Sequence, residues 1–499
     1  MNSSLPGSLG LQHVLSTKQA WWILILINGW HLLWTPWLGI MPQDAYYHLY
    51  AMHPSLSYFD HPPGVAWLIR LFQFAGGSHS ILLLKLMDWC SSLGVQIGAF
   101  MLYRTFTGYR ESLTLTVWLA TSPIILLLTF NTTPDVPLLL TWVWGLYFLR
   151  MALLHGKWMH WLLFSVLAGL TFDSKYTGIW ILLGMHGTLI FSSTYRRHYL
   201  TLWPYLATIL ALVVMSPVFI WNYHHGFVSF LFQSGERAAT IHRLNPALLP
   251  GHLGSQLGVV SPFLLVPIWR AIYHRMRDWL QRSILPDQWS LLIFTAPFVL
   301  GFALIALIYW VKINWVLPAY LTGIALAAPW LTRRGFYGHL IFSAVIHVLL
   351  ALEVAFYPVP IHSDDTWYGW EKLAEQVKNI QTDYPDDFVF SMDGYKTTAV
   401  LRFINRDQYF GENILGKPAL HFDYLGEDIQ QLEGKNALFV DSDPGLKDSN
   451  QEVPDLVKDH FGSTVYLRDI DIYRGNTKVR HFRVFRCLDY LGPGQKKVR

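Results

Sequence analysis

Two short stretches near the start of the chain carry side chains that could do chemistry. The stretch 43–48 holds Asp44, and the stretch 58–64 holds Asp60 and His61 followed by two prolines. Both lie between apolar segments, where charge and irregular backbone are costly unless they serve a site. Asp44 could act as a general base, which needs access to a substrate hydroxyl. The alternative is an ordinary solvated loop acid.

The acid and imidazole of Asp60 and His61 stand side by side before a rigid Pro-Pro break. Such a pair can hold a metal, a phosphate or each other, although a bare Asp-His pair also suits a turn and its cap. Asp135, in the short loop 131–137, has two interpretations as well. It could cap the helix that follows, or it could face Asp44 and Asp60 across a shared cavity.

Several cations accompany these acids. Lys85 and Asp88 are three residues apart, so we expect an internal ion pair, although Lys85 could also reach a phosphate. Lys175 interrupts an apolar region and could either neutralise Asp173 or bind an anion. Of the two adjacent histidines that precede Gly226, at most one, His225, is expected to be a ligand.

The composition restricts the protein class. Of the 499 residues, 53% are hydrophobic and only 14% are charged, which indicates a polytopic membrane protein. A net charge of +4 from scattered basic residues does not suggest a nucleic-acid-binding surface. The two cysteines, Cys90 and Cys487, offer neither a disulfide framework nor a Cys-based zinc site.

Apolar windows long enough to cross about 30 Å of hydrocarbon predict roughly eleven spans. The first window follows Lys18 and reads as a retained signal anchor. Basic residues gather in alternate loops, which places the N-terminus in the cytoplasm and the acid-bearing loops on the outer face. The windows lie near 21–40, 80–103, 113–130, 137–154, 161–172, 177–192, 201–221, 255–270, 289–310, 315–330 and 339–357.

The predicted fold class is therefore an all-α polytopic membrane domain with a C-terminal α/β soluble domain. Residues 1–357 form the membrane domain, whose first outer loop is 41–79 and includes an amphipathic helix at 66–74. Residues 358–499 are polar and lack a span-length apolar run, so we expect a soluble outer domain. Its predicted elements are a helix at 370–380 and strands at 388–391, 437–440 and 481–486.

Five motifs follow one another along the membrane domain. They are Asp44-Ala45-Tyr46-Tyr47 with Tyr58 to Pro63, Thr133 to Pro137, Ser174 to Thr177, Trp221-Asn222 with His225 and Ser229-Phe230, and Asn314-Trp315 with Pro318 to Tyr320. In this order they resemble the type C glycosyltransferases of the protein-mannosyltransferase and lipid A aminoarabinose-transferase superfamily. The resemblance is greatest to bacterial dolichyl-phosphate-mannose-protein mannosyltransferase-like members.

That resemblance implies transfer of a sugar from a polyprenyl phosphate to a hydroxyl at the outer face, with inversion. It maps the family's base onto Asp44, although the family has Asp-Glu where this chain has Gln43-Asp44. Asp135 is the second candidate catalytic residue. His61 and two lysines, Lys85 and Lys175, are the candidate ligands of the donor phosphate. Asp60 and His225 are the candidate ligands of a divalent metal, and no nucleotide cofactor is expected.

The expected partners are a polyprenyl-phosphate-linked sugar, a lipid acceptor such as a lipid A type glycan or a protein acceptor, and membrane lipids. The expected location is the inner membrane, with the C-terminal domain outside the cytoplasm. A transporter or flippase is the alternative class, because intramembrane charges also suit a pathway. It would predict an inverted internal repeat, and we see none in the sequence. A structural scaffold would not need so many outer-face acids and histidines.

Overall fold

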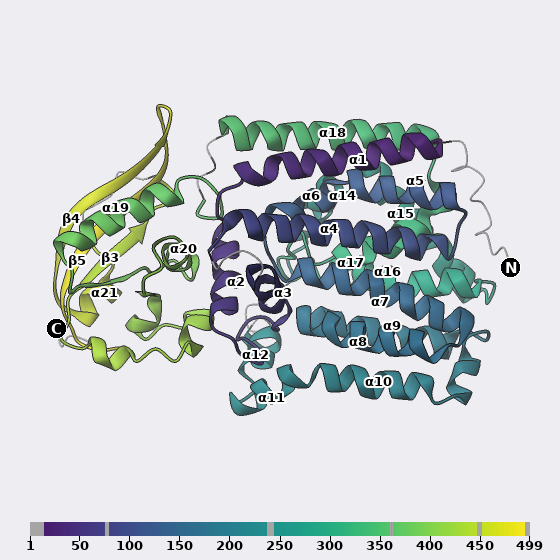
Figure 1. Ribbon diagram of the computed structural model, residues 1–499, viewed down its shortest axis with the longest axis horizontal. Helices are drawn as coiled ribbons and strands as arrows, with labels where there is room; N and C mark the ends of the chain where they lie inside the picture. Colours follow the sequence, from purple (N-terminus) through teal and green to yellow (C-terminus); the bar gives the residue numbers. More distant parts are fainter. Residues whose placement is uncertain are drawn as a thin grey trace.

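The computed structural model describes residues 14–74, 79–236, 244–359, 361, 363–446 and 452–494. A bundle of long helices forms one part, and a smaller α/β unit packs against one end of it (Figure 1). The helices of the first half are α1 (Thr17–Trp34), α2 (Pro42–Met52), α3 (Gly64–Phe74), α4 (Ile81–Arg104), α5 (Tyr109–Thr121), α6 (Pro123–Phe130), α7 (Asp135–His155), α8 (Trp158–Ser174), α9 (Trp180–Phe191), α10 (Trp203–Val214), α11 (Ser216–His224) and α12 (Val228–Leu231). The bundle is completed by α14 (Leu248–Val260), α15 (Pro262–Leu280), α16 (Pro286–Ile305), α17 (Leu317–Ala327) and α18 (Arg333–Phe356).

Four helices of the described chain, α4, α7, α16 and α18, are long and apolar enough to cross a membrane. Four further pairs qualify only if each bent pair counts as one span, which gives up to eight. The expected count of eleven is therefore not confirmed. The bent pairs are α1 with α2, α5 with α6, α10 with α11, and α14 with α15, bent by 81°, 56°, 45° and 114°.

Proline explains where these bends fall. The second helix of each bent pair has a proline in its first two positions. Proline lacks the N–H that would continue the preceding helix, and it is well tolerated at the start of a new one. The break between α1 and α2 brings Met41 and Gln43 to a cavity, where irregular backbone is tolerated because it does not contact lipid. The breaks after α5 and α14 meet inside the bundle, where Oγ of Ser122 donates to the carbonyl of Val259 at 3.0 Å.

The α/β unit contains a five-stranded sheet in the order β2-β1-β3-β5-β4. Strands β1, β2 and β3 pair in parallel, and β3, β5 and β4 pair antiparallel. Helix α19 (Trp370–Asp383) confirms the predicted helix, and three of the strands confirm the predicted ones; the long β4 was not predicted. The strands and remaining helices are β1 (Phe388–Phe390), α20 (Lys396–Asn405), β2 (Tyr409–Phe410), β3 (Ala437–Ser442), α21 (Asp455–His460), β4 (Phe461–Arg474) and β5 (Thr477–Tyr490).

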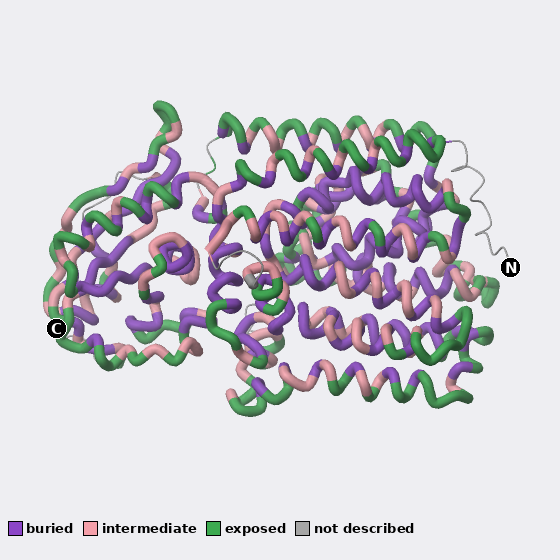
Figure 2. Tube along the Cα trace, viewed as in Figure 1, coloured by how far each residue is buried: buried purple, intermediate pink, exposed green. Residues whose placement is uncertain are grey.

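One apolar core joins the two parts of the molecule. Tyr46 and Tyr50 of α2 and Ile69 of α3 are buried in the same cluster as Leu373 of α19 and Val400 of α20. The segment 41–74 therefore packs against the α/β unit, and Figure 2 shows buried chain at this junction. The predicted helix in this segment is confirmed as α3.

Candidate active site

A cavity of about 710 Å³ lies where the bundle meets the α/β unit. Its walls come from α2, from the segment before α7, from the break between α8 and α9, and from the segment before α17. Much of the lining is apolar. The polar lining side chains include Gln43, His61, Asn131, Asp135, Lys175, Gln233, His252, Ser255, Lys312 and Asn314. Such a mixture is typical of a ligand site, in which a few polar groups orient a largely apolar ligand.

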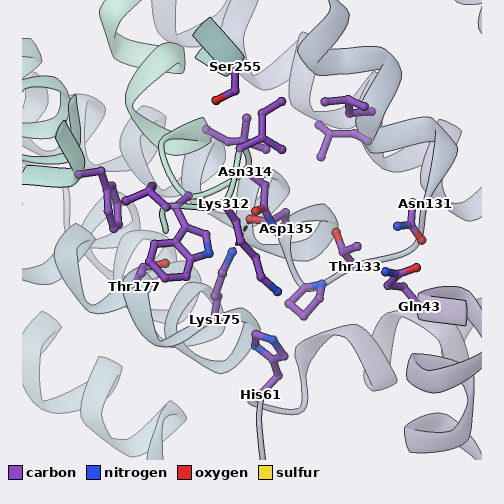
Figure 3. Close-up of a pocket in the computed structure, with 18 of the residues that line it drawn as sticks. Gln43, His61, Asn131, Thr133, Asp135, Lys175, Thr177, Ser255, Lys312 and Asn314 are labelled. Carbon is purple, nitrogen blue, oxygen red and sulfur yellow. Dashed lines mark hydrogen bonds and ion pairs between the residues drawn. The ribbon is translucent and has the colours of Figure 1, made fainter. Parts of the chain in front are cut away.

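Asp135 is the acid that the cavity contains. It begins α7, and its Oδ1 accepts a hydrogen bond from Nζ of Lys175 at 2.8 Å. Its Oδ2 accepts one from Nδ2 of Asn314 at 2.5 Å. Figure 3 shows this group with Lys312 and His61 beside it. Lys175 thus pairs with the carboxylate, and two further potential cations line the same cavity.

The break after α8 aims Lys175 into the cavity. Lys175 has extended backbone there, and its carbonyl accepts a hydrogen bond from the N–H of Gly178 at 2.7 Å. A Cβ at position 178 would fall on the carbonyl oxygen of Thr171, so only glycine fits this turn. The suggested pairing of Lys175 with Asp173 is wrong, because Lys175 bonds Asp135. Both carboxyl oxygens of Asp173 lack a hydrogen-bond partner among the described residues.

Asp44 and Lys85 form a fully buried ion pair. Nζ of Lys85 lies 2.5 Å from Oδ2 of Asp44, and it also donates to the carbonyl of Phe130 at 2.7 Å. Backbone N–H groups of Met41 and Thr132 donate to the two carboxylate oxygens at 2.9 and 2.7 Å. Neither charged side chain is among the residues that line the cavity. The pair lies directly behind that lining, because Met41 and Phe130 belong to it.

The predicted ion pair between Lys85 and Asp88 is wrong. Lys85 uses its ammonium on Asp44 and on Phe130, whereas Oδ2 of Asp88 accepts a hydrogen bond from Oγ1 of Thr132 at 2.7 Å. The sequence spacing was compatible with the pair, but the tertiary fold brings a carboxylate from α2 closer. Thr132 therefore joins both acids, since its N–H serves Asp44.

Asp60 and His61 have separate surroundings. Oδ1 of Asp60 accepts hydrogen bonds from the hydroxyls of Tyr46, at 2.8 Å, and of Tyr50. Its backbone carbonyl accepts one from Gln233 at 2.7 Å. His61 lines the cavity, where its ring lies 5.8 Å from the ring of Tyr47. Of the two, the imidazole faces the cavity and the carboxylate is held in a tyrosine cluster.

His225 lies in another aromatic cluster. Its ring stacks on Trp221 at 4.0 Å, and its Nδ1 lies 2.7 Å from the carbonyl oxygen of Trp221. It is not among the cavity-lining residues. Within the described part of the chain, no three His, Cys, Asp or Glu side chains gather closely enough to hold a metal ion. Arg237 and Arg243, which follow His225 in the sequence, lie outside the described residues.

The α/β unit contributes to the site. Tyr395 lines the cavity, and its ring lies 4.5 Å from that of Tyr46. Burial, with a smaller effect of nearby Asp365, raises the pKa of Tyr395, so it stays a neutral hydroxyl. Nε2 of Gln43 donates to Oδ1 of Asp365 at 3.1 Å, which joins α2 to the unit.

His421 fastens the same junction. Its backbone N–H donates to the hydroxyl of Tyr46 at 3.1 Å, and its Nδ1 accepts the N–H of Phe59 at 3.3 Å. Burial, with smaller contributions from the nearby imidazoles of His53 and His225, lowers the pKa of His421 to about 3. The neutral ring is the form that can accept from Phe59.

Three site residues were not predicted as chemical groups. Lys312 stands between the apolar windows 289–310 and 315–330, and an isolated lysine at such a position is a functional signal. Asn314 appeared only within a motif. No local sequence pattern indicates that Tyr395, a tyrosine of the α/β unit, lines this cavity.

Parts of the chain are similar in sequence to known proteins. Residues 60–221 match the family described as dolichyl-phosphate-mannose-protein mannosyltransferase. A lipid A galacturonosyltransferase, RgtD, of Rhizobium johnstonii is 25% identical over 300 residues, which is 58% of this chain and 60% of that relative. The aligned region thus spans about three fifths of that relative's length.

Two solved structures share the fold. ArnT from Cupriavidus metallidurans bound to undecaprenyl phosphate superposes with a TM-score of 0.62 at 14% identity, covering 94% of this chain and 98% of that chain. The Archaeoglobus fulgidus oligosaccharyltransferase in complex with Zn and sulfate gives a TM-score of 0.51 at 12% identity, covering 84% and 68%. At these identities the likeness establishes the fold.

Proposed function

We propose that this chain is a type C membrane glycosyltransferase of the protein-mannosyltransferase and ArnT superfamily, and that it is an inverting, polyprenyl-phosphate-sugar-dependent enzyme. It would move a sugar to a hydroxyl of a lipid A type glycolipid, or of a protein, at the outer face of the inner membrane. The relative RgtD acts on lipid A and the ArnT structure holds a polyprenyl phosphate. Both names therefore favour a lipid-borne donor and a lipid acceptor.

One observation carries this proposal. A mostly apolar cavity holds the ion pair of Lys175 with Asp135, and Lys312 and His61 line the same cavity. A polyprenyl phosphate has the matching form, an apolar chain that ends in an anion. Charge-assisted hydrogen bonds from lysine to phosphate are strong in a site that excludes water.

In the proposed reaction the acceptor oxygen attacks the anomeric carbon as the bond from that carbon to the phosphate oxygen breaks. Polyprenyl phosphate leaves with the bonding electrons, and the acceptor's proton passes to a carboxylate. Lys175, with Lys312 and His61, offsets the charge that grows on the leaving phosphate. Single displacement inverts the anomeric carbon.

The proton has two candidate acceptors, Asp44 and Asp135. Asp135 already lines the cavity, so a bound acceptor could reach it directly. Asp44 would need the thin wall formed by Met41 and Phe130 to open, and Lys85 would have to exchange partners. Because Lys85 is paired with Asp44, its proposed role is to position that carboxylate and not to bind the donor phosphate.

Asp60 and His225, the candidate metal ligands, have other partners. Asp60 is held by two tyrosine hydroxyls and Nδ1 of His225 is held against a backbone carbonyl, so the two do not form a donor set. The proposed cations suffice for the leaving group, and no nucleotide takes part. Elemental analysis of the purified protein is the direct check on a bound divalent ion.

We also propose the membrane arrangement expected from sequence. The chain would divide near Tyr357, with about eleven crossings before it, the N-terminus in the cytoplasm and the 358–499 domain outside. Support comes from the basic loops and from α18, the last long apolar helix, which ends at Phe356. A cysteine introduced at Glu412 should react with an impermeant reagent added from outside; reaction only from the cytoplasm would overturn this orientation.

The activity can be tested with purified protein in lipid vesicles. The donors would be synthetic polyprenyl phosphates carrying a hexose, a pentose or a hexuronic acid, and the acceptors lipid A and a Ser/Thr-rich peptide. Wild-type protein should form one new glycosidic bond of inverted configuration. Asp135→Asn and Asp44→Asn should each remain folded, and the variant of the true base should lose at least 100-fold in turnover.

The matched control is Asp407→Asn, which removes an exposed acid of the α/β unit from a surface ion pair. It should retain full activity. Consumption of the donor without sugar transfer to either acceptor would refute the proposed reaction. Full activity in both Asp135→Asn and Asp44→Asn would refute the proposed base.

A further inference from the structure

A second hollow lies beside the first, between the outer ends of the bundle helices and the α/β unit. It has a volume of about 780 Å³. Its walls come from the end of α1 and the turn after it, from the first turn of α4, from the last turn of α18, and from α19 with Arg474 of β4. None of the candidate catalytic or phosphate-binding residues lines it.

Aromatic side chains gather around this second cavity. Trp34, Trp37, Trp367 and Tyr368 all line it, and Trp37 is 70% exposed. Tryptophan and tyrosine concentrate where the hydrocarbon of a bilayer meets its polar headgroups, because their rings are amphipathic. The second cavity therefore has the chemistry of a bilayer interface.

An apolar surface leads away from this cavity along the bundle. Leu33 of α1, Leu82 of α4 and Phe356 of α18 are exposed near it. Helices α1 and α18 form the outer layer of the bundle (Figure 1), and exposed chain runs along both (Figure 2). Exposed apolar helix faces of this length suit the acyl chains of a lipid.

Two cations lie at the polar end of the second cavity. Nη2 of Arg474 donates to the carbonyls of Val354 and Ala355 at 2.8 and 2.6 Å, while its Nη1 has no hydrogen-bond partner among the described residues. Lys372 is exposed and donates to the Tyr473 carbonyl at 3.3 Å. With Glu371 as the one acid among the lining residues, positive charge is in excess.

We propose that the second cavity binds a membrane lipid whose headgroup carries a phosphate. Lys372 and Arg474 would hold the phosphate, the tryptophans would lie at the level of the glycerol, and the acyl chains would follow α1 and α18. Aromatic and basic groups around one headgroup are the features that retain anionic lipids. This site is separate from the donor cavity and does not depend on the transfer reaction.

One pair of aromatic rings lies between the two cavities. Phe130 lines the main cavity and Trp367 lines the second, and their rings meet edge to face at 5.6 Å. The backbone at Gly39 packs so tightly that an added Cβ would lie 2.5 Å from the Trp367 carbonyl. A lipid in the second cavity would thus stand next to the main site without entering it.

The test is binding to the full-length protein in detergent, followed by native mass spectrometry. Phosphatidylglycerol should bind with at least fivefold higher affinity than diacylglycerol with the same acyl chains. Lys372→Glu should remove that preference. The matched control is Lys378→Glu on the same helix, whose side chain pairs with Asp407 at the surface, and it should bind as wild type does.

Two further measurements locate the lipid and identify its source. A phosphatidylglycerol with a photoreactive acyl chain should label the last turns of α1 or α18, and Trp37→Ala should reduce that labelling. Equal affinity for glycerol phosphate without acyl chains would show a site for a soluble anion and overturn the proposal. Unchanged phosphatidylglycerol binding in Lys372→Glu, or labelling spread evenly over the bundle, would overturn it too.

Discussion

Nζ of Lys85 lies 2.5 Å from Oδ2 of Asp44, and neither side chain is exposed to solvent. Lys85 belongs to α4 and Asp44 to α2, so their ion pair links α2 to the helical bundle. Two backbone N–H groups complete the set of donors to Asp44. Asp44, which the motif suggested as the base, therefore also links α2 to α4 behind the cavity lining.

The buried ion pair of Asp44 with Lys85 predicts that removing both charges restores stability that is lost when only one is removed. Lys85→Met leaves a buried carboxylate without its cation, and loss of one partner of a buried pair costs on the order of 3–5 kcal/mol. The double variant Asp44→Asn/Lys85→Met removes both charges and should recover most of the lost melting temperature in detergent. If Asp44 is the base, the double variant should recover stability without activity; recovery of both would leave Asp44 a structural role only.

Lys175 should govern the affinity for the donor. Lys175→Met removes one charge-assisted hydrogen bond, which is worth about 1.5–3 kcal/mol, or about a 10-fold to 150-fold rise in the donor's Kd. Titration of purified protein with a labelled polyprenyl phosphate measures this. Lys378→Met, which removes an exposed lysine, serves as the control, and an unchanged Kd in Lys175→Met would remove Lys175 from the phosphate site.

His421 should make the junction sensitive to acid. Its pKa in the folded protein is about 3, mainly because it is buried, whereas the unfolded chain has an ordinary value near 6.5. Below pH 6.5 the His421 imidazole becomes protonated in the unfolded chain, whereas the buried imidazole of the folded protein stays neutral. Stability is therefore present above pH 6.5 and is lost as the pH falls toward 3, by up to about 1.4 kcal/mol per unit.

The variant His421→Gln keeps an acceptor for the N–H of Phe59 and does not titrate. Melting temperatures measured from pH 7.5 to pH 5 should therefore fall less in this variant than in the wild type. Parallel curves for the two proteins would contradict the assignment.

The turn at Gly178 should be required for the Lys175 side chain to point into the cavity. In Gly178→Ala the new methyl group would fall on the backbone of Thr171, so the break after α8 must shift, at a cost of about 1–3 kcal/mol. We expect a lower melting temperature and weaker donor binding together. The control is Gly254→Ala, since an added Cβ at that helical glycine contacts nothing within 4 Å, and it should be neutral or slightly stabilising.

The sequence by itself determined the class of the protein and most of its candidate groups. Apolar windows, the change in composition after Tyr357 and the ordered motifs reflect local chemistry, so a helical membrane protein with an α/β domain could be predicted. Asp135, Lys175 and His61 were singled out because charge within apolar surroundings is costly, and the structure places these three in one cavity.

Only the tertiary structure decided which charges pair. Spacing along one helix favoured Lys85 with Asp88, and adjacency made Asp173 one of two candidate partners of Lys175, yet each lysine pairs with an acid from another helix. A lysine side chain is long enough to reach several neighbours, and a buried ammonium takes the partner that the packing of helices brings closest. The same packing brings Tyr395 and His421 to the site from more than 300 residues away, a proximity that no local pattern encodes.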